Sequence, residues 1–519
     1  MYLCGCDVTV LMRDCDVMQK NMRKRITRRE FFKTAFGTGL LIGCKSMVLG
    51  TGLLNSGKPM ALAPKKGIGY SLDVQLYNNP LPIAPGNPSI RFHDNRCILC
   101  GDCAEFCRTK MTVYEQVSSL PDEEVCIRCG QCTIVCPEHA LTEKYHYQEV
   151  AKVIANPDKI MVASTSPAIR VVLGEMFGLA PGTNVEGKIV GALKHLGVEH
   201  VLDATISADL AVMEEATELM QRIESRGVKN LLPMFTSCCP AWVRFVKLFY
   251  PALLPNLSTV KSPLMMQGAL IKTYYAQKTG IDPEKIVHVA LTPCTAKKEE
   301  ILWDGMNAAG ISLGNPDMRD VDVALTCREL AYLLNDLKVD FPQMQDESYS
   351  SFMGKGSGAG MIFGNTGGVM EATLRTAYKL LNGGNPPADF LDLQAVRGFD
   401  NVRQASIELG KHKLNVAVVH GIANVRPLLE EIQNDRQKFD FIEVMACTGG
   451  CIGGGGQPIN RTIDAMELKQ LRLNALYQRD VNQEIRLSCD NPEIKAIYDE
   501  FLDKPFGKKS KELLHLRPK

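Results

Sequence analysis

The 519-residue chain has no excess of charge of either sign, because its 59 Lys and Arg residues are matched by 58 Asp and Glu residues. A surface for nucleic acid or for an anionic membrane normally needs a basic excess, so the composition favours neither partner. The chain also lacks a Walker lysine followed by Ser or Thr. Its glycine run from 354 to 360 lacks the G-x-G-x-x-G spacing of dinucleotide sites, and we therefore expect no NAD binding.

Cysteine, by contrast, is abundant: the chain has 19, and many of them lie in two similar runs. The runs are Cys97-x2-Cys100-x2-Cys103-x3-Cys107 and Cys126-x2-Cys129-x2-Cys132-x3-Cys136. In bacterial ferredoxins each such run supplies three thiolates to one [4Fe–4S] cluster, and its fourth cysteine binds the other cluster. We therefore predict one cluster on Cys97, Cys100, Cys103 and Cys136, and a second on Cys126, Cys129, Cys132 and Cys107. Two zinc ribbons are the alternative, but zinc has no use for the third and fourth cysteines of each run.

The N-terminal segment, residues 1–63, is typical of an export signal. Basic residues and the pair Arg28-Arg29 precede an apolar stretch, which ends near a small-residue Ala-Leu-Ala cleavage site. Paired arginines at this place indicate the twin-arginine route for folded, cofactor-loaded proteins, so we expect a periplasmic location. An uncleaved anchor helix and lipid attachment at Cys44 are alternatives, and Met22 is a usable start inside the segment.

The remaining chain divides into four parts. A Pro/Gly/Asn-rich linker at 64–87 precedes a ferredoxin-like domain at 88–145. Between 146 and 460, short apolar runs alternate with amphipathic helical patterns, which favours an α/β domain of parallel sheets covered by helices. From 461 to 519 the chain is charged and helical. The expected strands are 160–163, 201–203, 231–235, 286–290, 321–325, 416–419 and 441–445.

Three loops that follow predicted strands carry further cysteines. They are 235–242 with Cys238-Cys239, 292–300 with Cys294, and 443–458 with Cys447 and Cys451. Each loop alone is weak evidence, because adjacent cysteines are often buried thiols and glycine runs are usually turns. Ligands in α/β folds bind beyond the carboxyl ends of strands. Together, the loops bring at least four thiolates to such ends, which is enough for another iron–sulfur cluster.

These loops resemble the three signature segments of the [FeFe]-hydrogenases, and the similarity runs from about residue 90 to the C-terminus. The segment 461–519 resembles the small subunit of two-chain periplasmic members, here fused into one chain. The resemblance implies two parallel-type sheets with the active site between them, after an α+β ferredoxin-like domain. It also implies the H-cluster: a [4Fe–4S] cluster on Cys239, Cys294, Cys447 and Cys451, with Cys451 bridging to a diiron unit that carries CO, cyanide and a dithiolate amine.

The resemblance further implies which groups surround the diiron unit. Lys297 matches a donor to one cyanide, because an ammonium forms charge-assisted hydrogen bonds with an anionic acceptor. Without the resemblance, Lys297 would be taken for a solvated lysine. The other matches are Ser262 and the backbone at Ser166-Pro167 for the second cyanide, and Phe363 and Met445 for apolar walls.

The activity that the resemblance implies, H2 ⇌ 2H⁺ + 2e⁻, also needs a proton route. Cys238 matches the family's proton-transferring thiol, and Glu215, Glu218 and Ser258 match its relay to solvent. The two glutamates are three residues apart on a predicted helix and therefore share one face. An exposed acidic face that includes Glu214 is the alternative.

Three residues depart from the usual family pattern near the diiron unit. Thr292 replaces a common Met, Ser166 a common Ala, and Leu264 a common Gln. Such exchanges alter polarity and hydrogen bonding around a metal centre and thereby tune it. They suggest a divergent subgroup.

We expect H2 uptake in the periplasm, with electrons leaving through the two ferredoxin-type clusters to a c-type cytochrome or another carrier. Maturation proteins would supply the diiron unit. A hydrogen sensor and a hydrogenase-related iron–sulfur assembly protein are the alternative functions. Against them, the chain has no added signalling domain and retains Cys238 and the loop 236–242.

Overall fold

The computed structural model describes residues 83–116, 124–226, 231–434 and 438–516. These residues belong to one compact unit that spans Ala63–Lys519. The predicted export signal, the lipid-attachment alternative at Cys44 and most of the predicted linker lie outside the described residues. No helix within the described ranges is both long and apolar enough to cross a bilayer.

The cysteine-rich part is a small α+β unit built from two matching halves. Strand β1 (Ile90–Phe92) pairs antiparallel with β2 (Leu141–Glu143), and helices α3 (Asp102–Phe106) and α4 (Gln131–Val135) pack together. In each cysteine loop, two residues have a positive φ at equivalent positions: Leu99 and Gly101 in the first, Arg128 and Gly130 in the second. The doubled cysteine run therefore folds as a doubled loop.

The first large sheet is entirely parallel, in the order β4-β3-β6-β7. Its strands are β3 (Ile160–Thr165), β4 (His200–Asp203), β6 (Ile286–Thr292) and β7 (Val323–Thr326). Side chains of β3 alternate between two cores, one shared with α6 (Glu186–His195) and α13 (Cys327–Asp336), the other with α7 (Ala204–Glu224) and α9 (Pro263–Leu270). Both faces are thus buried, which explains the continuous apolar runs of these strands.

The second sheet differs from the prediction, because it is mixed. Its order is β5-β10-β9-β8, and β5 (Met234–Phe235), β10 (Phe441–Met445) and β9 (His412–His420) are parallel. The edge strand β8 (Val402–Leu409) runs antiparallel to β9, to which it is joined by a tight turn at Gly410 with φ 61°. The fold class is therefore α/β with parallel sheets, but the expectation of two parallel-type sheets is wrong for this edge.

Helix α7 links the two sheets. Asp203 accepts a hydrogen bond from the Thr205 amide and thereby caps the helix N-terminus. The first half of α7 packs in the core of the first sheet, and its second half packs in a core with β10 and α15 (Gly368–Asn382). Nearly all of α7 is buried, so polar side chains on it must find partners inside the protein.

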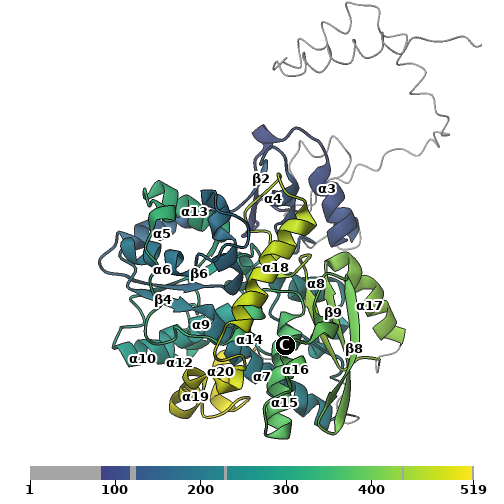
Figure 1. Cartoon of the computed structure of the whole chain (residues 1–519). Helices are drawn as coiled ribbons and strands as arrows, with labels where there is room; N and C mark the ends of the chain where they lie inside the picture. Colours follow the sequence, from purple (N-terminus) through teal and green to yellow (C-terminus); the bar gives the residue numbers. More distant parts are fainter. Residues whose placement is uncertain (1–82, 117–123, 227–230, 435–437, 517–519) are drawn as a thin grey trace, which may run out of the picture. The chain divides into compact units, whose positions relative to one another are not determined.

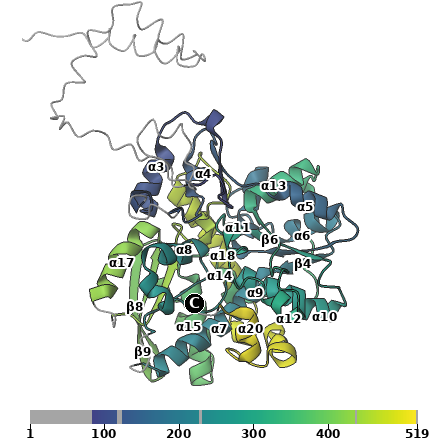
Figure 2. The ribbon, with the colours of Figure 1, turned by 180° about the vertical axis from the view of Figure 1, so that it is seen from behind.

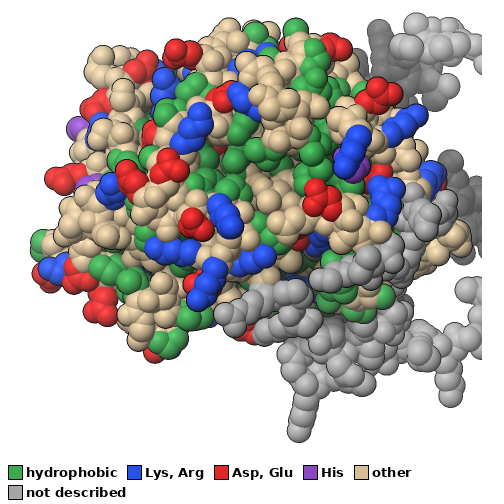
Figure 3. Space-filling model, turned by 90° about the horizontal axis from the view of Figure 1, so that it is seen from below, with side chains coloured by type: hydrophobic (Ala, Val, Ile, Leu, Met, Phe, Trp, Pro, Cys, Tyr) green, Lys and Arg blue, Asp and Glu red, His purple; other side chains and the backbone are tan. Residues whose placement is uncertain are grey.

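The C-terminal segment forms α18 (Ala465–Val481), α19 (Pro492–Ile497) and α20 (Lys508–Leu514). Both ribbon views show α18 crossing between the sheet with β4 and β6 and the sheet with β8 and β9 (Figures 1 and 2). Helix α18 contacts α14 (Gly358–Ile362), and α20 contacts α9. On the face drawn in Figure 3, acidic and basic side chains are interspersed, in keeping with the nearly balanced charge.

Candidate active site

The three cysteine loops converge on one cavity. Loops after β5, β6 and β10 place Cys238 and Cys239, Cys294, and Cys447 and Cys451 in its lining. Because β6 belongs to the first sheet and β5 and β10 to the second, the cavity lies between the two sheets. Other predicted residues also line it: Ser166, Pro167, Leu264, Thr292, Lys297, Phe363 and Met445.

The spacing of the sulfurs bears on which metal group fits. Burial and the nearby thiols of Cys239, Cys294 and Cys451 raise the pKa of Cys447 well above its usual range, so these sulfurs share one environment. In the described part of the chain, no three cysteine sulfurs lie within 4.8 Å of one another. Four thiolates on a single zinc ion would be about 3.8 Å apart, because each Zn–S bond is about 2.3 Å. The donor set therefore fits a wider inorganic core better than a single ion.

Two polar groups beside the thiols fit a bound, anionic ligand. Lys297 Nζ contacts Glu300 Oε2 at 2.6 Å and the Cys238 carbonyl oxygen at 3.3 Å, and it lines the cavity. Burial lowers the pKa of Lys297, but Glu300 and Cys294 outweigh it and raise the pKa above its usual value. The buried Ser262 hydroxyl has no hydrogen-bond partner among the described residues, an arrangement that costs free energy unless a ligand accepts the bond. Ser262 itself lines a neighbouring cavity rather than the cysteine cavity.

The eight ferredoxin-type cysteines form two groups that each mix the two runs. Burial, then the neighbouring thiols of Cys136, Cys100 and Cys97, raises the pKa of Cys103 to about 12. In the other group, Cys107, Cys126, Cys129 and Cys132 line one small cavity. Burial and the thiols of Cys129, Cys126 and Cys103 raise the pKa of Cys107, and those of Cys129, Cys126, Cys107 and Cys103 raise that of Cys132. These neighbourhoods agree with the crossed ligand assignment, which stays a prediction.

Gln131 connects the ferredoxin-like unit to the cysteine cavity, a role that the sequence prediction missed. Its side-chain amide donates to Cys447 Sγ at 3.2 Å and to the Gly453 carbonyl oxygen at 2.8 Å. Gln131 begins α4, the helix that also contains Cys132. Cys129 just before it is close enough to Cys447 to raise the pKa of that thiol. The second ferredoxin-type group and the cavity cysteines are therefore neighbours.

The predicted proton relay consists of buried groups that lie near one another. Glu214, Glu215 and Glu218 are 0%, 4% and 2% exposed, which excludes the alternative of an exposed acidic face. Burial, then the charge of Glu218, raises the pKa of Glu215 to about 8, while the nearby hydroxyls of Thr373 and Ser258 oppose the shift. The Ser258 hydroxyl donates to Glu218 Oε2 at 2.9 Å. Ser258 is therefore near both carboxyl groups.

The two ends of this path reach the two cavities. At the inner end, burial and the charge of Glu215 raise the pKa of Cys238 well above its usual range, so the thiol keeps its proton at neutral pH. At the outer end, Glu218 and Ser258 line the second cavity, whose volume is about 880 Å³ against about 80 Å³ for the first. A cavity of this size holds many water molecules, each of which occupies roughly 30 Å³ in the liquid.

Arg222 is a further member of this path that the sequence prediction missed. Its guanidinium contacts Glu218 Oε1 at 2.7 Å and also binds the carbonyl oxygens of Leu231, Asn256 and Leu257. Arg222 follows Glu218 by four residues on α7, a spacing at which helical side chains meet. That spacing was the local signal that could have identified it.

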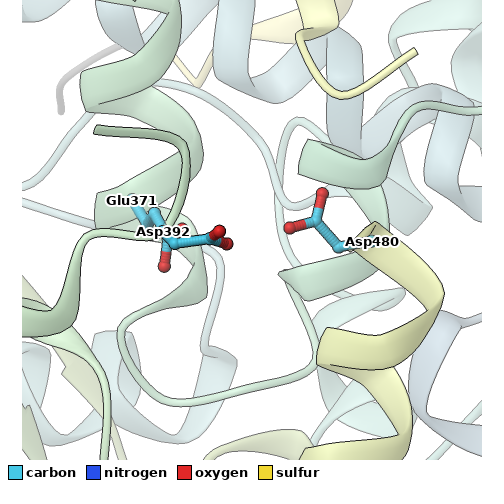
Figure 4. Close-up of side chains that lie close together, drawn as sticks. All are labelled: Glu371, Asp392 and Asp480. Carbon is cyan, nitrogen blue, oxygen red and sulfur yellow. The ribbon is translucent and has the colours of Figure 1, made fainter. Parts of the chain in front are cut away.

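A separate cluster of three carboxylates is a salt-bridge network rather than a metal site. Figure 4 shows Glu371 and Asp392 on one side, facing Asp480 of α18 on the other. Three guanidinium groups neutralise them: Arg375 and Arg397 both contact Glu371 at 2.6 Å, and Arg486 contacts Asp480 at 2.6 Å. Equal numbers of opposite charges leave no net attraction for a cation. The cluster joins the C-terminal segment to α15.

Comparison with known families gives three matches. The description "Iron only hydrogenase large subunit, C-terminal domain" matches residues 159–455, which is more than half of the chain. "Iron hydrogenase small subunit" matches 466–517, and "4Fe-4S binding domain" matches 120–142, which contains the second cysteine run. The C-terminal segment, expected from its resemblance to a small subunit, is thereby confirmed as such a region.

Comparison with individual proteins also finds hydrogenases. The NADP-reducing hydrogenase subunit HndD of Solidesulfovibrio fructosivorans is 43% identical over 81% of this chain and 73% of its own length. The periplasmic [Fe] hydrogenase large subunit of Nitratidesulfovibrio vulgaris is 39% identical over 74% of this chain and 90% of its own. Among solved structures, an apo [FeFe]-hydrogenase from Chlamydomonas reinhardtii superposes with a TM-score of 0.63 at 36% identity, over 72% of this chain and 99% of that one. Through its large-subunit domain, its small-subunit region and its identity to these enzymes, the chain belongs to the iron-only, or [FeFe], hydrogenases, which interconvert dihydrogen with protons and electrons.

Proposed function

We propose that this hydrogenase oxidises H2 at an H-cluster held by Cys239, Cys294, Cys447 and Cys451. The observation that carries the proposal is the convergence of these four thiols, from three strand-end loops, in one cavity between the sheets. When bound, the cluster supplies the iron centre and the amine base at which dihydrogen is split or formed. The chain's own residues then orient ligands, exclude water, move protons and connect to an electron path.

Lys297, in the lining of the cysteine cavity, would donate a hydrogen bond to an anionic ligand of the cluster, and Ser262, in the adjacent cavity, would offer a second donor. Lys297 is charged and buried, so its bond to an anion is charge-assisted and poorly screened. Ser262 has a free buried hydroxyl, and the backbone at Ser166-Pro167 lies at the N-terminus of a short 3-10 turn in the lining. Phe363 and Met445 are buried walls that keep water out of the site.

Protons pass between the cluster and solvent through Cys238, Glu215, Ser258 and Glu218. The Cys238 thiol holds a proton at the inner end, and its neighbour Glu215 exchanges it because the pKa of that carboxyl, about 8, is close to neutral. Ser258 hands the proton to Glu218 across their 2.9 Å hydrogen bond. From Glu218 it reaches the second cavity.

The ferredoxin-like unit would hold two further [4Fe–4S] clusters, which would carry electrons between the cavity and the surface. The group with Cys126, Cys129, Cys132 and Cys107 is next to the cavity cysteines through Cys129 and Cys447. The other group reaches the surface, since Cys100 is exposed, and a c-type cytochrome or another carrier would accept electrons there. Maturation proteins supply the diiron unit.

The cofactor proposal is tested on protein matured with its assembly factors. Iron and sulfide analysis should show an H-cluster plus two [4Fe–4S] clusters, and infrared spectra should show CO and cyanide bands. Cys107→Ala and Cys136→Ala should each disturb the cluster bound mainly by the other run. Matured protein without these infrared bands, or with zinc at the cysteine runs, would overturn the proposal.

The uptake direction and the periplasmic location are proposed together. Two observations support them. The chain has a twin-arginine pattern at Arg28-Arg29, and a 39% identical relative carries the word periplasmic in its name. Protein-film voltammetry should show an oxidation current larger than the evolution current, and evolution alone would refute uptake. A reporter fused after residue 63 should be exported, whereas the double variant Arg28→Lys, Arg29→Lys should leave it in the cytoplasm.

A further inference from the structure

The last described residues, which end at Leu516, pair with the segment that carries Ser258 and Ser262. His515 forms an antiparallel bridge with Val260. The Lys261 amide donates to the Leu514 carbonyl oxygen at 2.9 Å, and the Leu516 amide donates to the Thr259 carbonyl oxygen at 2.7 Å. The small-subunit region thus adds a short strand to a segment of the large-subunit domain that contains a relay residue.

The buried His515 ring uses both nitrogens. Nε2 lies 3.0 Å from Glu214 Oε2, and Nδ1 lies 2.8 Å from the Thr259 hydroxyl. Glu214 also accepts hydrogen bonds from the Tyr498 hydroxyl at 2.7 Å and from the Phe506 amide at 2.6 Å. Because a carboxylate is an acceptor, Nε2 donates to it, which leaves Nδ1 for the hydroxyl. Three C-terminal residues therefore satisfy one buried carboxylate on α7.

Thr259 also contacts the relay, through its backbone amide. The Thr259 amide donates to Glu218 at 3.0 and 3.2 Å, beside the 2.9 Å bond from Ser258 to the same carboxylate. Glu214 and Glu218 are one helical turn apart on α7. His515 therefore clamps α7 to the 258–260 segment at the place where the relay crosses from one to the other. Proton transfer depends steeply on such geometry, and a 1 Å displacement costs about 100-fold in unfavourable cases.

We infer that His515 is a positioning residue for proton transfer. It holds Ser258 and Thr259 in hydrogen-bonding distance of Glu218. The inference rests on the proposed relay through Glu218. The C-terminal segment would then contribute to proton transfer as well as cover the catalytic domain. His515 does not line the cysteine cavity, and its side-chain hydrogen bonds go to Glu214 and Thr259, which adjoin the relay.

Two substitutions separate the two contacts of the ring. The side-chain amide of His515→Gln reaches the place of Nε2 and keeps the bond to Glu214, but loses the bond to Thr259. His515→Asn places its amide near Nδ1, so it keeps the bond to Thr259 and loses the bond to Glu214. His195→Gln, on the exposed end of α6, is the matched control.

We expect His515→Gln to lower H2 turnover by about 10-fold, which is within the range that misplaced reacting groups cause. The solvent isotope effect should increase, and the pH profile of turnover should change. His515→Asn should retain more activity, and His195→Gln should behave as the unchanged protein. Infrared bands of the cluster should stay the same in all three. A crystal structure of apo His515→Gln should show Ser258 Oγ and Glu218 Oε2 farther apart than the present 2.9 Å.

The reference variant is Glu218→Gln. If Glu218→Gln loses turnover while His515→Gln keeps the original turnover, pH profile and isotope effect, the relay stands and the inference about His515 fails. If His515→Gln loses turnover only in proportion to a lower cluster content, with an unchanged isotope effect, His515 has a structural role only. That result also refutes the inference about His515. If Glu218→Gln retains full turnover, the proposed relay itself is wrong.

Discussion

At the scale of single residues, the adjacent thiols of Cys238 and Cys239 have different surroundings. Cys239 is the N-cap of α8 (Pro240–Phe249); burial raises the pKa of its thiol, and hydrogen bonds from the backbone amides of Ala446, Trp242 and Ala241 oppose that rise. No such amide is among the leading influences on Cys238, whose pKa is raised by burial and by Glu215. A thiol with stabilising donors suits a thiolate ligand, and one beside a carboxylate suits proton transfer.

Cys238→Ala should abolish H2 turnover in both directions and leave the clusters in place, because the variant has no group to pass a proton to Glu215. Gas uptake and evolution assays, combined with infrared spectroscopy on the same sample, measure the two effects. Cys327→Ala, at a buried thiol in the core of the first sheet, is the control for lost thiol volume. Retained activity in Cys238→Ala would show that protons take another route.

Glu215→Gln should change how stability depends on pH. The folded carboxyl has a pKa of about 8 and the reference value is 4.5, so the folded state holds its proton in a range where the unfolded state has lost it. The contribution of Glu215 is therefore fully present below pH 4.5 and declines as pH rises to 8. Gln cannot ionise, so the variant should gain stability relative to the original protein over this window. Urea unfolding at pH 5 and pH 8 tests this, and an equal difference at both pH values would contradict it.

At the scale of elements, α4 contributes to both the ferredoxin-like unit and the active site. It contains Cys132 and begins with Gln131, whose amide donates to Cys447 Sγ. Hydrogen bonds to cluster sulfurs stabilise the reduced, more negative state and so raise the reduction potential. A short helix thereby connects the second cysteine run to the cavity.

Gln131→Leu should lower the potential of the cavity [4Fe–4S] cluster. A net hydrogen bond of about 1 kcal/mol corresponds to about 40 mV for one electron. Redox titration followed by electron paramagnetic resonance, on protein that carries this cluster without the diiron unit, measures the shift. Gln470→Leu, an exposed position on α18, is the control. An unchanged potential would mean that this bond does not tune the cluster.

At the scale of the whole molecule, buried salt bridges join the small-subunit region to the catalytic domain. Asp480 of α18 contacts Arg375 at 2.8 Å and Arg486 at 2.6 Å, and Arg375 is fully buried. On the same helix, Arg472 contacts Glu175 at 2.6 Å. Because such groups are costly to leave unpaired, the network specifies how α18 docks.

Asp480→Asn should destabilise the protein by about 3–5 kcal/mol, because it leaves Arg375 and Arg486 partly unpaired. Glu431→Gln removes an exposed partner of Lys438 and should cost less than about 1 kcal/mol. Thermal unfolding of both variants, each with its clusters quantified, gives the comparison. Equal shifts would show that the buried network contributes no more than a surface pair.

Most strands could be predicted because their apolar runs are local and buried on both faces, as in 441–445, which is β10. Strand β8 was missed because, as an edge strand, it has alternating burial and no continuous apolar run. Among the site residues, Arg222 had a local signal in its spacing from Glu218. Gln131 and His515 had none, since their partners Cys447 and Glu214 are 316 and 301 residues away.

The sequence by itself determined the family, the two cysteine runs and the strand-end loops, because chemistry of this kind requires particular residues at short, recognisable spacings. Only the tertiary structure decided which distant groups meet: the antiparallel edge of the second sheet, the amide on Cys447 and the C-terminal histidine against the relay. Those contacts depend on where whole elements pack, and no local pattern of residues records that.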